Sequence, residues 1–277
     1  MIQYGAHEPG IASAGIGPVV DAIGRGRRRA RLRFAVLFVL TWTVLVGGFG
    51  LAIALSGRVD ADFLIEYGPY FLGGVPTTIF VSVTSIFFAV LFALVGALAR
   101  VSSIAPIYAS ATLYVSLVRG TPLIVQIFFI YSALPQFGIV LPALVAGIFA
   151  LSFNYGAYMT EIFRAGIQAV PRAQLEAASA LGMSDWQRMR RIVLPQAIRI
   201  VTPAIGNEFI AMIKDSALVS FVALTELFWR TRTVGSAQFR SFETLLFAAV
   251  VYWLLTIVFT VFQERLERRM AESDRRV

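Results

Sequence analysis

Long apolar runs, separated by short charged blocks, constrain this chain more than any other feature of its sequence. Of the 277 residues, 58% are hydrophobic and only 14% are charged. A soluble domain of this size has too little interior to bury so much apolar surface, so part of the chain must face lipid. The net charge of +8 could indicate nucleic-acid binding, but the basic residues gather between the apolar runs. That distribution is typical of positive-inside membrane topology, and we expect no nucleic-acid partner.

Scarce residue types exclude several kinds of chemistry. The sequence contains no cysteine and one histidine, His7, which lies in a Gly- and Ala-rich N-terminal stretch. A thiolate or multi-histidine metal site and a Ser–His–Asp triad are therefore not expected within this chain. Lys214 is the only lysine, and no G-x-x-x-x-G-K-[ST] phosphate loop can be written around it. We expect no catalytic residue, no metal site and no cofactor here, so that any ATP and Mg²⁺ must bind a partner subunit.

Six apolar runs are about long enough to cross a bilayer as helices. A signal peptide would normally have a shorter apolar region ending in small residues, so we favour a retained first helix. The expected parts are a cytoplasmic Arg-rich leader (1–33), an extra N-terminal transmembrane helix (34–56), a core (71–264) and a cytoplasmic charged tail (265–277). The predicted spans lie at 34–56, 71–99, 107–134, 141–162, 198–227 and 242–262.

The distribution of arginine orients these spans. The leader carries six arginines between residues 25 and 33 without an acidic residue, which predicts that both termini are cytoplasmic. Residues 57–70 then form a loop outside, and the charged insert at 171–191 lies in the cytoplasm. One loop disagrees with the rule, because residues 229–243 contain three arginines and are nevertheless predicted to lie outside. The sequence thus predicts an all-α membrane protein with about six transmembrane helices.

The charged insert contains a spaced motif. It combines Glu176-Ala177-Ala178, Gly182 and Ile192-Val193-Leu194-Pro195, which fits E-A-A-x(3)-G-x(9)-I-x-L-P at every fixed position. The spacing predicts a short helix, a sharp turn at a glycine that tolerates unusual backbone angles, and a second helix. An amphipathic connector lying on the lipid surface is the alternative, and the complete spacing match argues against it.

This motif resembles the cytoplasmic loop of permease subunits in bacterial ATP-binding-cassette (ABC) importers. In that family the loop is a coupling helix that sits in a groove of the ATPase subunit. The resemblance therefore implies that Glu176, Ala177, Ala178, Gly182, Ile192, Leu194 and Pro195 couple this chain to an ATPase.

The resemblance extends over about residues 73–267 and points to the polar amino-acid uptake family. It is carried by Gly74-Val75-Pro76-Thr77-Thr78, Arg119-Gly120-Thr121-Pro122, Gly156-Ala157-Tyr158 and Leu194-Pro195-Gln196-Ala197. The chain departs from the pattern at residues 214–218, which read Lys-Asp-Ser-Ala-Leu rather than Lys-Asp-Thr-Ser-Leu. Residues 1–70 lie outside the resemblance.

The resemblance implies a type I ABC importer permease core in the bacterial cytoplasmic (inner) membrane. The implied partners are ABC ATPase subunits, a second permease subunit (the same or a homologous chain), an extracytoplasmic amino-acid-binding protein and the lipid bilayer. The chain would form the translocation pathway for a polar amino acid and would have no enzymatic activity of its own.

Ionisable and amide side chains within spans are costly, and they usually face a protein interior or a water-filled path. Arg119 and Glu208 are such residues, and Asn154, Tyr158, Glu161, Lys214 and Asp215 are the candidates for a pathway or gate. Each of these has a second interpretation. Glu161 pairs with Arg164 structurally or contacts the coupling loop, Lys214 and Asp215 gate the path or fix packing, and Asn154 and Tyr158 bind substrate or link helices.

Two other functions fit the buried charges but not the spaced motif. A secondary transporter driven by protons or sodium would use Glu161 or Asp215 as its coupling carboxylate, but six spans would normally be half of such a protein. A membrane-embedded enzyme would need carboxylate or serine chemistry, and the spans contain neither paired aspartates nor a serine–lysine arrangement.

Overall fold

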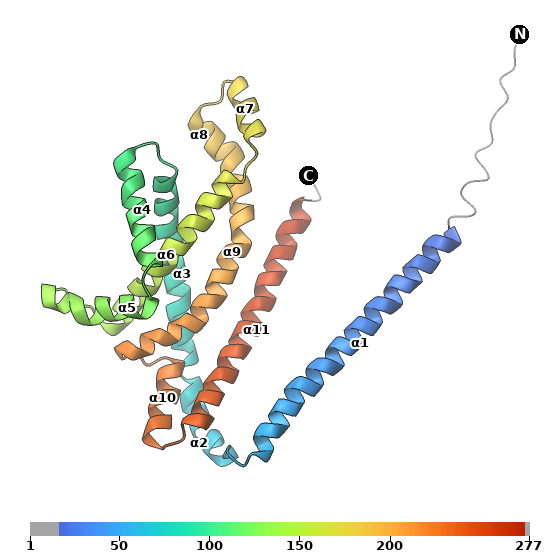
Figure 1. The fold of residues 1–277 in the computed structure, drawn as a ribbon, viewed down its shortest axis with the longest axis vertical. Helices are drawn as coiled ribbons and strands as arrows, with labels where there is room; N and C mark the ends of the chain where they lie inside the picture. The colour runs from blue at the N-terminus through green and yellow to red at the C-terminus, as the bar shows by residue number, and fades with distance from the viewer. Residues whose placement is uncertain (1–16, 275–277) are drawn as a thin grey trace, which may run out of the picture. The chain divides into compact units, whose positions relative to one another are not determined.

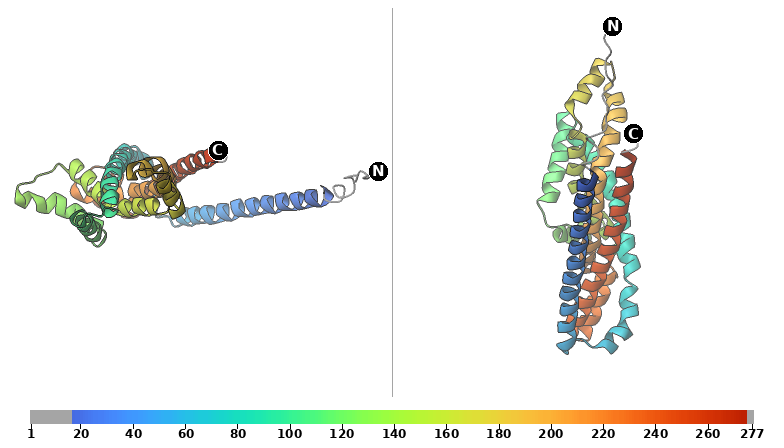
Figure 2. Two further views of the ribbon diagram at one scale, coloured as in Figure 1. Left: turned by 90° about the horizontal axis from the view of Figure 1, so that it is seen from above. Right: turned by 90° about the vertical axis from the view of Figure 1, so that its right-hand side faces the viewer.

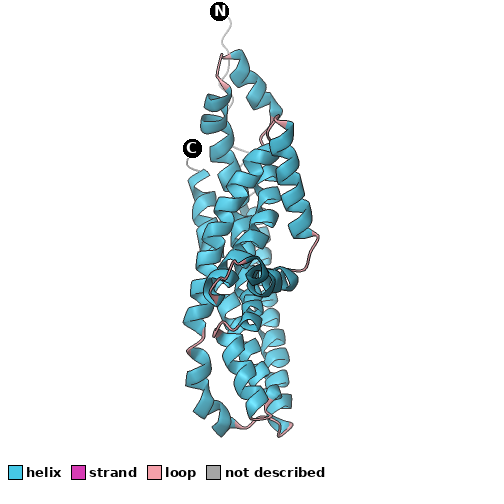
Figure 3. Cartoon of the chain, turned by 90° about the vertical axis from the view of Figure 1, so that its left-hand side faces the viewer, coloured by secondary structure: helices cyan, strands magenta, loops and turns pink. Residues whose placement is uncertain are grey.

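The computed structural model describes residues 17–274, and that part of the chain is helical, with no strand (Figure 3). The chain divides into two compact units after residue 60. The first unit contains one long helix, α1 (Gly17–Leu55), whose apolar portion is long enough to cross a membrane. This helix includes nearly all of the predicted span at 34–56. Residues 1–16 of the leader and 275–277 of the tail lie outside the described residues.

The second unit is a bundle of helices built around α3 (Val75–Arg100) and α6 (Ala143–Gln168) (Figures 1 and 2). Around them lie α2 (Ala61–Leu72), α4 (Ala105–Arg119), α5 (Leu123–Phe128), α9 (Leu194–Asp215), α10 (Leu227–Ala237) and α11 (Ser241–Asp274). Two short helices, α7 (Arg172–Ala180) and α8 (Asp185–Arg188), project from one end of the bundle, at the top of Figure 1.

Small residues allow α3 and α6 to approach each other closely. Ala89 and Ala93 of α3 are fully buried, and a side chain added at Gly96 would collide with Thr160 of α6. On the other helix, Gly156 faces Phe92 and leaves no room for a larger residue. Because lipid gives helices no hydrophobic reason to associate, close packing between small residues supplies the attraction. The contact between these two helices is the most extensive in the bundle.

The predicted span at 107–134 is not one continuous helix, because the chain bends sharply in the middle of it. α4 ends at Arg119, and the next helical segment, Leu123–Phe137, lies at 105° to it. Pro122 explains the break, since proline lacks a backbone N–H and forces the residue before it out of helical geometry. The second half continues from α5 through a π-turn (Phe129–Ala133) and a 3₁₀ turn (Leu134–Phe137).

Two other boundaries also differ from the prediction. The helix that begins in the fifth predicted span ends at Asp215 rather than near residue 227, and a 3₁₀ helix (Ser216–Val222) follows it. The chain then turns at Ala223, whose φ of 65° is left-handed, before α10 begins. The predicted loop at 57–70 is largely helical and forms α2.

The number of helices that qualify as spans is therefore smaller than six. Within the described residues, four helical segments are long and apolar enough to cross a membrane, and the bent pair at 105–137 adds a fifth. These four segments are Ala30–Leu55, Ala61–Arg100, Ala143–Gln168 and Ser241–Met270. The remaining predicted span corresponds to α9, which has 22 residues but carries four ionisable side chains.

The three arginines that conflict with the positive-inside rule are held by aromatic rings of neighbouring segments. The guanidinium carbons lie over the ring centroids as follows: Arg230 over Tyr70 at 4.9 Å, Arg232 over Phe221 at 4.6 Å and Arg240 over Phe63 at 4.8 Å. Arg230 also donates a hydrogen bond to the backbone oxygen of Tyr70 at 3.0 Å. Such cation–π contacts stabilise a charge locally, so these arginines have a structural role that is independent of topology.

A buried carboxylate joins three helices at the same end of the bundle. The Glu226 side chain is fully buried and caps α10 by accepting hydrogen bonds from the backbone N–H groups of Phe228 at 2.9 Å and Trp229 at 2.7 Å. It also accepts hydrogen bonds from the hydroxyl groups of Tyr252 at 2.6 Å and Thr78 at 3.2 Å. A buried charge of this kind is stable only because its oxygens are saturated with donors.

We predict that Glu226→Ala destabilises the second unit. The substitution removes the cap of α10 and leaves buried donors unpaired, which should cost about 2–4 kcal/mol. The measurement is the melting temperature of the purified protein in mild detergent. Glu264→Ala is the control, because Glu264 is exposed and pairs with Arg268 only at 3.4 Å. Equal melting temperatures for the two variants would contradict the prediction.

Candidate functional site

The α7–α8 hairpin, residues 172–193, is a compact helical turn. Gly182 has a φ of +75°, a backbone conformation that favours glycine, and its N–H donates to the backbone oxygen of Ser179 at 2.9 Å. The Met183 N–H donates to the oxygen of Ala178 at 3.1 Å, which closes the end of α7. Ser184 and Gln187 then cap α8 by exchanging hydrogen bonds between side chain and backbone.

Side-chain contacts keep the two arms of the hairpin together. The Arg188 guanidinium of α8 donates hydrogen bonds to Ser179 of α7 and pairs with Asp185. At the base of the hairpin, the Gln196 amide donates to Gln174 Oε1 at 2.7 Å. Together with the cap and the glycine turn, these contacts define a rigid shape for a segment that projects from the bundle.

The outer surface of the hairpin exposes large apolar side chains. The Leu181 side chain is 83% exposed and that of Trp186 is 70% exposed, on either side of the Gly182 turn. Exposed tryptophan is uncommon on a polar surface, and tryptophan is enriched at the centres of protein interfaces. Sequence analysis did not single out these two residues, because the motif specifies only the positions that shape the turn.

The structure places the motif residues along the hairpin and its junction with α9. Glu176 and Ala177 are exposed on α7, Ala178 is buried, Gly182 forms the turn, Ile192 is half-buried, and Leu194 and Pro195 are exposed at the start of α9. The helix of α8 runs through a π-turn (Met189–Val193) directly into α9. The hairpin and α9 are therefore mechanically continuous.

A polar cavity of about 540 Å³ lies where α6, α9 and the α4–α5 bend meet. Its ionisable lining residues are Arg119, Glu208 and Asp215. The Tyr155 hydroxyl donates to Asp215 Oδ2 at 2.8 Å, and this bond joins α6 to the end of α9. The Arg119 guanidinium carbon lies 5.1 Å from the centre of the Tyr158 ring, which holds the cation at the rim of the cavity.

The bend between α4 and α5 is held open by amide hydrogen bonds. The Gln126 Nε2 donates to the Val118 oxygen at 2.8 Å and to Thr121 Oγ1 at 2.8 Å, and these bonds satisfy the backbone at the break. The Asn154 Nδ2 of α6 donates to Gln126 Oε1 at 3.2 Å. Backbone that leaves helical geometry inside a membrane is tolerated where it lines a cavity and is satisfied in this way.

Three of the five candidate pathway residues line this cavity. Asn154, Tyr158 and Asp215 do, whereas Lys214 is exposed on another face of α9 and Glu161 lies elsewhere. α9 stays helical through Asp215, so the adjacent Lys214 and Asp215 point in different directions, and only Asp215 lines the cavity. Tyr155 was missed because a single tyrosine in a span carries no distinguishing sequence pattern.

Glu161 belongs to an arginine–glutamate cluster at the hairpin end of the bundle. Its two oxygens accept from Arg100 Nε at 3.0 Å and from Arg164 Nε at 2.8 Å. Arg100 also donates to Thr112 Oγ1 at 2.7 Å, so the cluster ties α3, α4 and α6 together. Of the two interpretations of Glu161, the structure shows the ion pair with Arg164. Arg100 is an additional partner, and it lies too far from Glu161 in the sequence to have been predicted.

α9 connects the hairpin to the cavity and contains one irregularity. Pro203 lies inside the helix and cannot donate the usual backbone hydrogen bond. The Gln263 amide of α11 donates to the Pro203 oxygen at 3.1 Å and to Asn207 Oδ1 at 3.1 Å. Gly206 provides the room for this approach, since a side chain there would collide with Gln263. α11 therefore contacts α9 next to the position of the missing hydrogen bond.

The amino-acid sequence of this chain matches a known protein family. The family described as "Binding-protein-dependent transport system inner membrane component" matches residues 89–272, which is more than half of the chain. No three His, Cys, Asp or Glu side chains among the described residues are placed to hold a metal ion.

Individual relatives match over nearly their full length. The L-cystine transport system permease protein TcyB of Bacillus subtilis is 37% identical over 79% of this chain and 94% of its own length. The arginine transport system permease protein ArtQ of the same organism is 35% identical over 78% of this chain and 100% of its own length. A crystal structure described as an amino acid ABC transporter with histidines has a TM-score of 0.72, with 42% identity over 76% of this chain and 99% of that chain.

The fold of about three quarters of the chain is thus shared with a solved amino acid ABC transporter. The chain belongs to the family of inner-membrane components of binding-protein-dependent transport systems, and it is a multi-pass permease subunit of the ABC importer type.

Proposed function

We propose that this permease subunit imports a polar amino acid and is driven by ATP that a separate ATPase subunit hydrolyses. The α7–α8 hairpin carries the proposal, because it is a rigid projection whose tip exposes the large apolar side chains of Leu181 and Trp186. The amino-acid substrates of the similar permeases support the choice of cargo. The sequence contains no phosphate loop of its own, which is consistent with ATP and Mg²⁺ binding to the partner.

The hairpin is the proposed contact with the ATPase and therefore lies in the cytoplasm. The C-terminal end of α11 lies at the same end of the bundle as the hairpin (Figure 1). The six arginines between residues 25 and 33, in the N-terminal part of α1, also predict a cytoplasmic position for that end of the chain. Both termini are thus proposed to be cytoplasmic, and the α10 end, with Glu226, faces outside.

The polar cavity is the proposed contact with substrate. An amino-acid zwitterion presents a carboxylate and an ammonium group, and the cavity offers the Arg119 guanidinium together with the Glu208 and Asp215 carboxylates. Its volume of about 540 Å³ is within the range of small-molecule sites. Because carboxylates outnumber the guanidinium, we propose that neutral and cationic amino acids are favoured over acidic ones.

The proposed cycle follows from these two sites. An extracytoplasmic binding protein delivers the amino acid to a pathway between this chain and a second permease subunit. Two ATPase subunits close on ATP and displace the hairpins, and the continuous helix α9 carries the displacement to Asp215. ATP hydrolysis then resets the pathway.

We predict that Trp186→Ala weakens binding of the ATPase subunit by about tenfold or more, as expected for a central interface tryptophan. The permease itself should remain folded, because this side chain is exposed. The measurement is the amount of ATPase that co-purifies with a tagged permease. Phe239→Ala is the matched control, since Phe239 is an exposed aromatic residue in the loop between α10 and α11. Undiminished ATPase recovery with Trp186→Ala would argue against the contact.

We predict that Gly182→Val uncouples transport, whereas Gly182→Asn largely preserves it. Apart from its chain neighbours, no atom lies within 4 Å of a Cβ added at this position, so the difference reports mainly on backbone strain. Asparagine tolerates a positive φ, and a β-branched residue does not. The measurement is amino-acid uptake per ATP hydrolysed in proteoliposomes. If both variants behaved alike, the left-handed turn would not matter for coupling.

We predict that Asp215→Asn reduces uptake of the amino acid substantially more than Lys214→Ala. Asp215 lines the cavity and accepts the Tyr155 hydrogen bond, whereas the neighbouring Lys214 does not line it. The measurement is uptake of radiolabelled neutral, cationic and acidic amino acids, with complex assembly checked by size-exclusion chromatography. The reverse order of effects would favour a pathway on the Lys214 face. Uptake that follows an imposed ion gradient without ATP would instead indicate a secondary transporter.

A further inference from the structure

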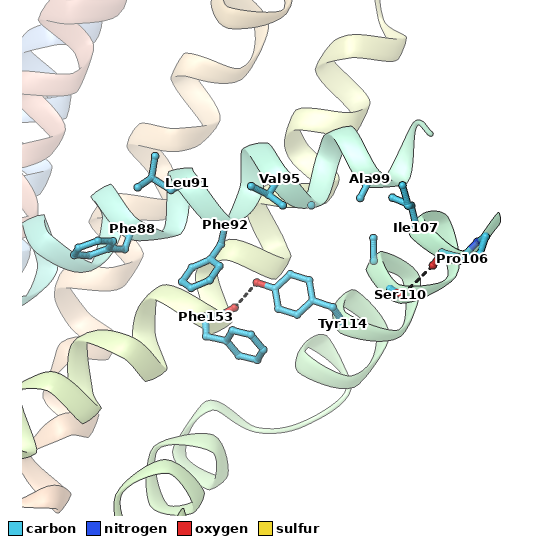
Figure 4. Close-up of a pocket in the computed structure, with 12 residues that line it drawn as sticks. Phe88, Leu91, Phe92, Val95, Ala99, Pro106, Ile107, Ser110, Tyr114 and Phe153 are labelled. Carbon is cyan, nitrogen blue, oxygen red and sulfur yellow. Dashed lines mark hydrogen bonds between the residues drawn. The ribbon is translucent and has the colours of Figure 1, made fainter. Parts of the chain in front are cut away.

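An apolar groove of about 770 Å³ lies between α3 and α4, with α6 as its floor (Figure 4). Phe88, Leu91 and Val95 line it from α3, and Ile107 lines it from α4. Its two hydroxyl groups are already occupied. Ser110 donates to the Pro106 oxygen at 2.9 Å, and Tyr114 donates to the Phe153 oxygen at 2.7 Å. Both hydroxyl protons are therefore donated within the protein, and the mostly apolar lining fits an apolar ligand better than water.

The groove has the depth of one lipid leaflet. Its lining on α3 runs from residue 88 to residue 99. At about 1.5 Å per residue this stretch is roughly 16 Å long, and half of the ~30 Å hydrocarbon core of a bilayer is about 15 Å. The groove ends next to Arg100, the last residue of α3, at the hairpin end of the bundle. If the hairpin is cytoplasmic, as proposed above, the groove spans the cytoplasmic leaflet.

The groove faces away from the polar cavity. Phe153 of α6 lines the groove, whereas Asn154, Tyr155 and Tyr158 of the same helix line the cavity. At about 100° per residue, Tyr155 and Tyr158 are displaced from Phe153 by roughly 200° and 140° around the helix. The two hollows thus occupy nearly opposite faces of α6. A second permease subunit that shares the pathway would pack on the cavity side, away from the groove.

The charges at the mouth of the groove suit an anionic headgroup. Arg100 and Arg164 flank the single carboxylate of Glu161, so the cluster carries one positive charge in excess. The Arg100 guanidinium carbon lies 4.9 Å from the centre of the Tyr108 ring, one residue beyond Ile107 of the groove wall. An apolar channel of leaflet depth with a cationic end matches an acyl chain that carries a phosphate.

We propose that this groove binds one acyl chain of a phospholipid from the cytoplasmic leaflet, with its phosphate at the Arg100 end. The assignment to that leaflet rests on the proposed function, and the ligand class does not. The Tyr114–Phe153 hydrogen bond and the Arg100–Thr112 hydrogen bond fix α4 at a distance from α3, so the side chains cannot close the gap. The acyl chain fills it and supports α4, which ends at Arg119 in the polar cavity.

The test is to measure phospholipid retained by the whole importer complex, purified in mild detergent, by native mass spectrometry. We expect about one phospholipid per permease chain to survive washing. Ala99→Phe and Ser110→Phe place a ring in the groove, and excluding even two methylenes should lower retention about tenfold. Leu98→Phe and Leu113→Phe are the matched controls, because these residues are 55% and 67% exposed on the same helices and lie outside the groove.

Two further measurements keep the outcomes distinct. The melting temperature of each variant shows whether it has folded, and phosphatidylglycerol added back to stripped complex should raise it for the wild type but not for the groove variants. Because the chain has no cysteine, Ser110→Cys provides a single thiol for cross-linking. Cross-linking to a second permease chain would overturn the proposal, as would equal lipid retention in groove and control variants. If the ATPase co-purifies normally in that case, only this inference fails and the proposed function stands.

Discussion

The close contact between α3 and α6 is the constraint on which the rest of the structure depends. Alanine and glycine on both helices let the two backbones approach closely. Because bilayer lipid supplies no hydrophobic driving force for helix association, this close packing holds the pair together. With this pair fixed, one face of α6 lines the polar cavity and the opposite face lines the apolar groove. The cavity can therefore be polar because a separate, tightly packed seam holds the helices in place.

Much of the architecture could be predicted from the sequence because it depends on local patterns. Apolar length identified α1, α3, α6 and α11, and the spaced motif located the α7–α8 hairpin with its glycine turn. The break at Pro122 was missed because the apolar run continues on both sides of it, and hydropathy does not register a change of direction. The early end of α9 was missed for a similar reason.

Contacts between distant segments were the part that the sequence could not provide. Asn154 and Tyr158 lie four residues apart on α6, and both line the cavity. The bond between Tyr155 and Asp215 joins residues 60 positions apart, and the Arg100–Glu161 pair joins residues 61 positions apart. No single-sequence pattern specifies such pairs. Which of two adjacent residues faces the cavity was equally open, and the structure places Asp215 there and Lys214 on an exposed face of α9.

Pro203 divides α9 into two segments of unequal length. Proline has no backbone N–H, so one hydrogen bond of the helix is missing there, and sharp bends in helices occur at such residues. The segment on the hairpin side, counted from Pro195, is eight residues long, and the segment that ends at Asp215 is twelve. A bend at Pro203 therefore displaces the Asp215 end farther than the hairpin end, and Gln263 of α11, which donates to the Pro203 oxygen, holds the point of bending.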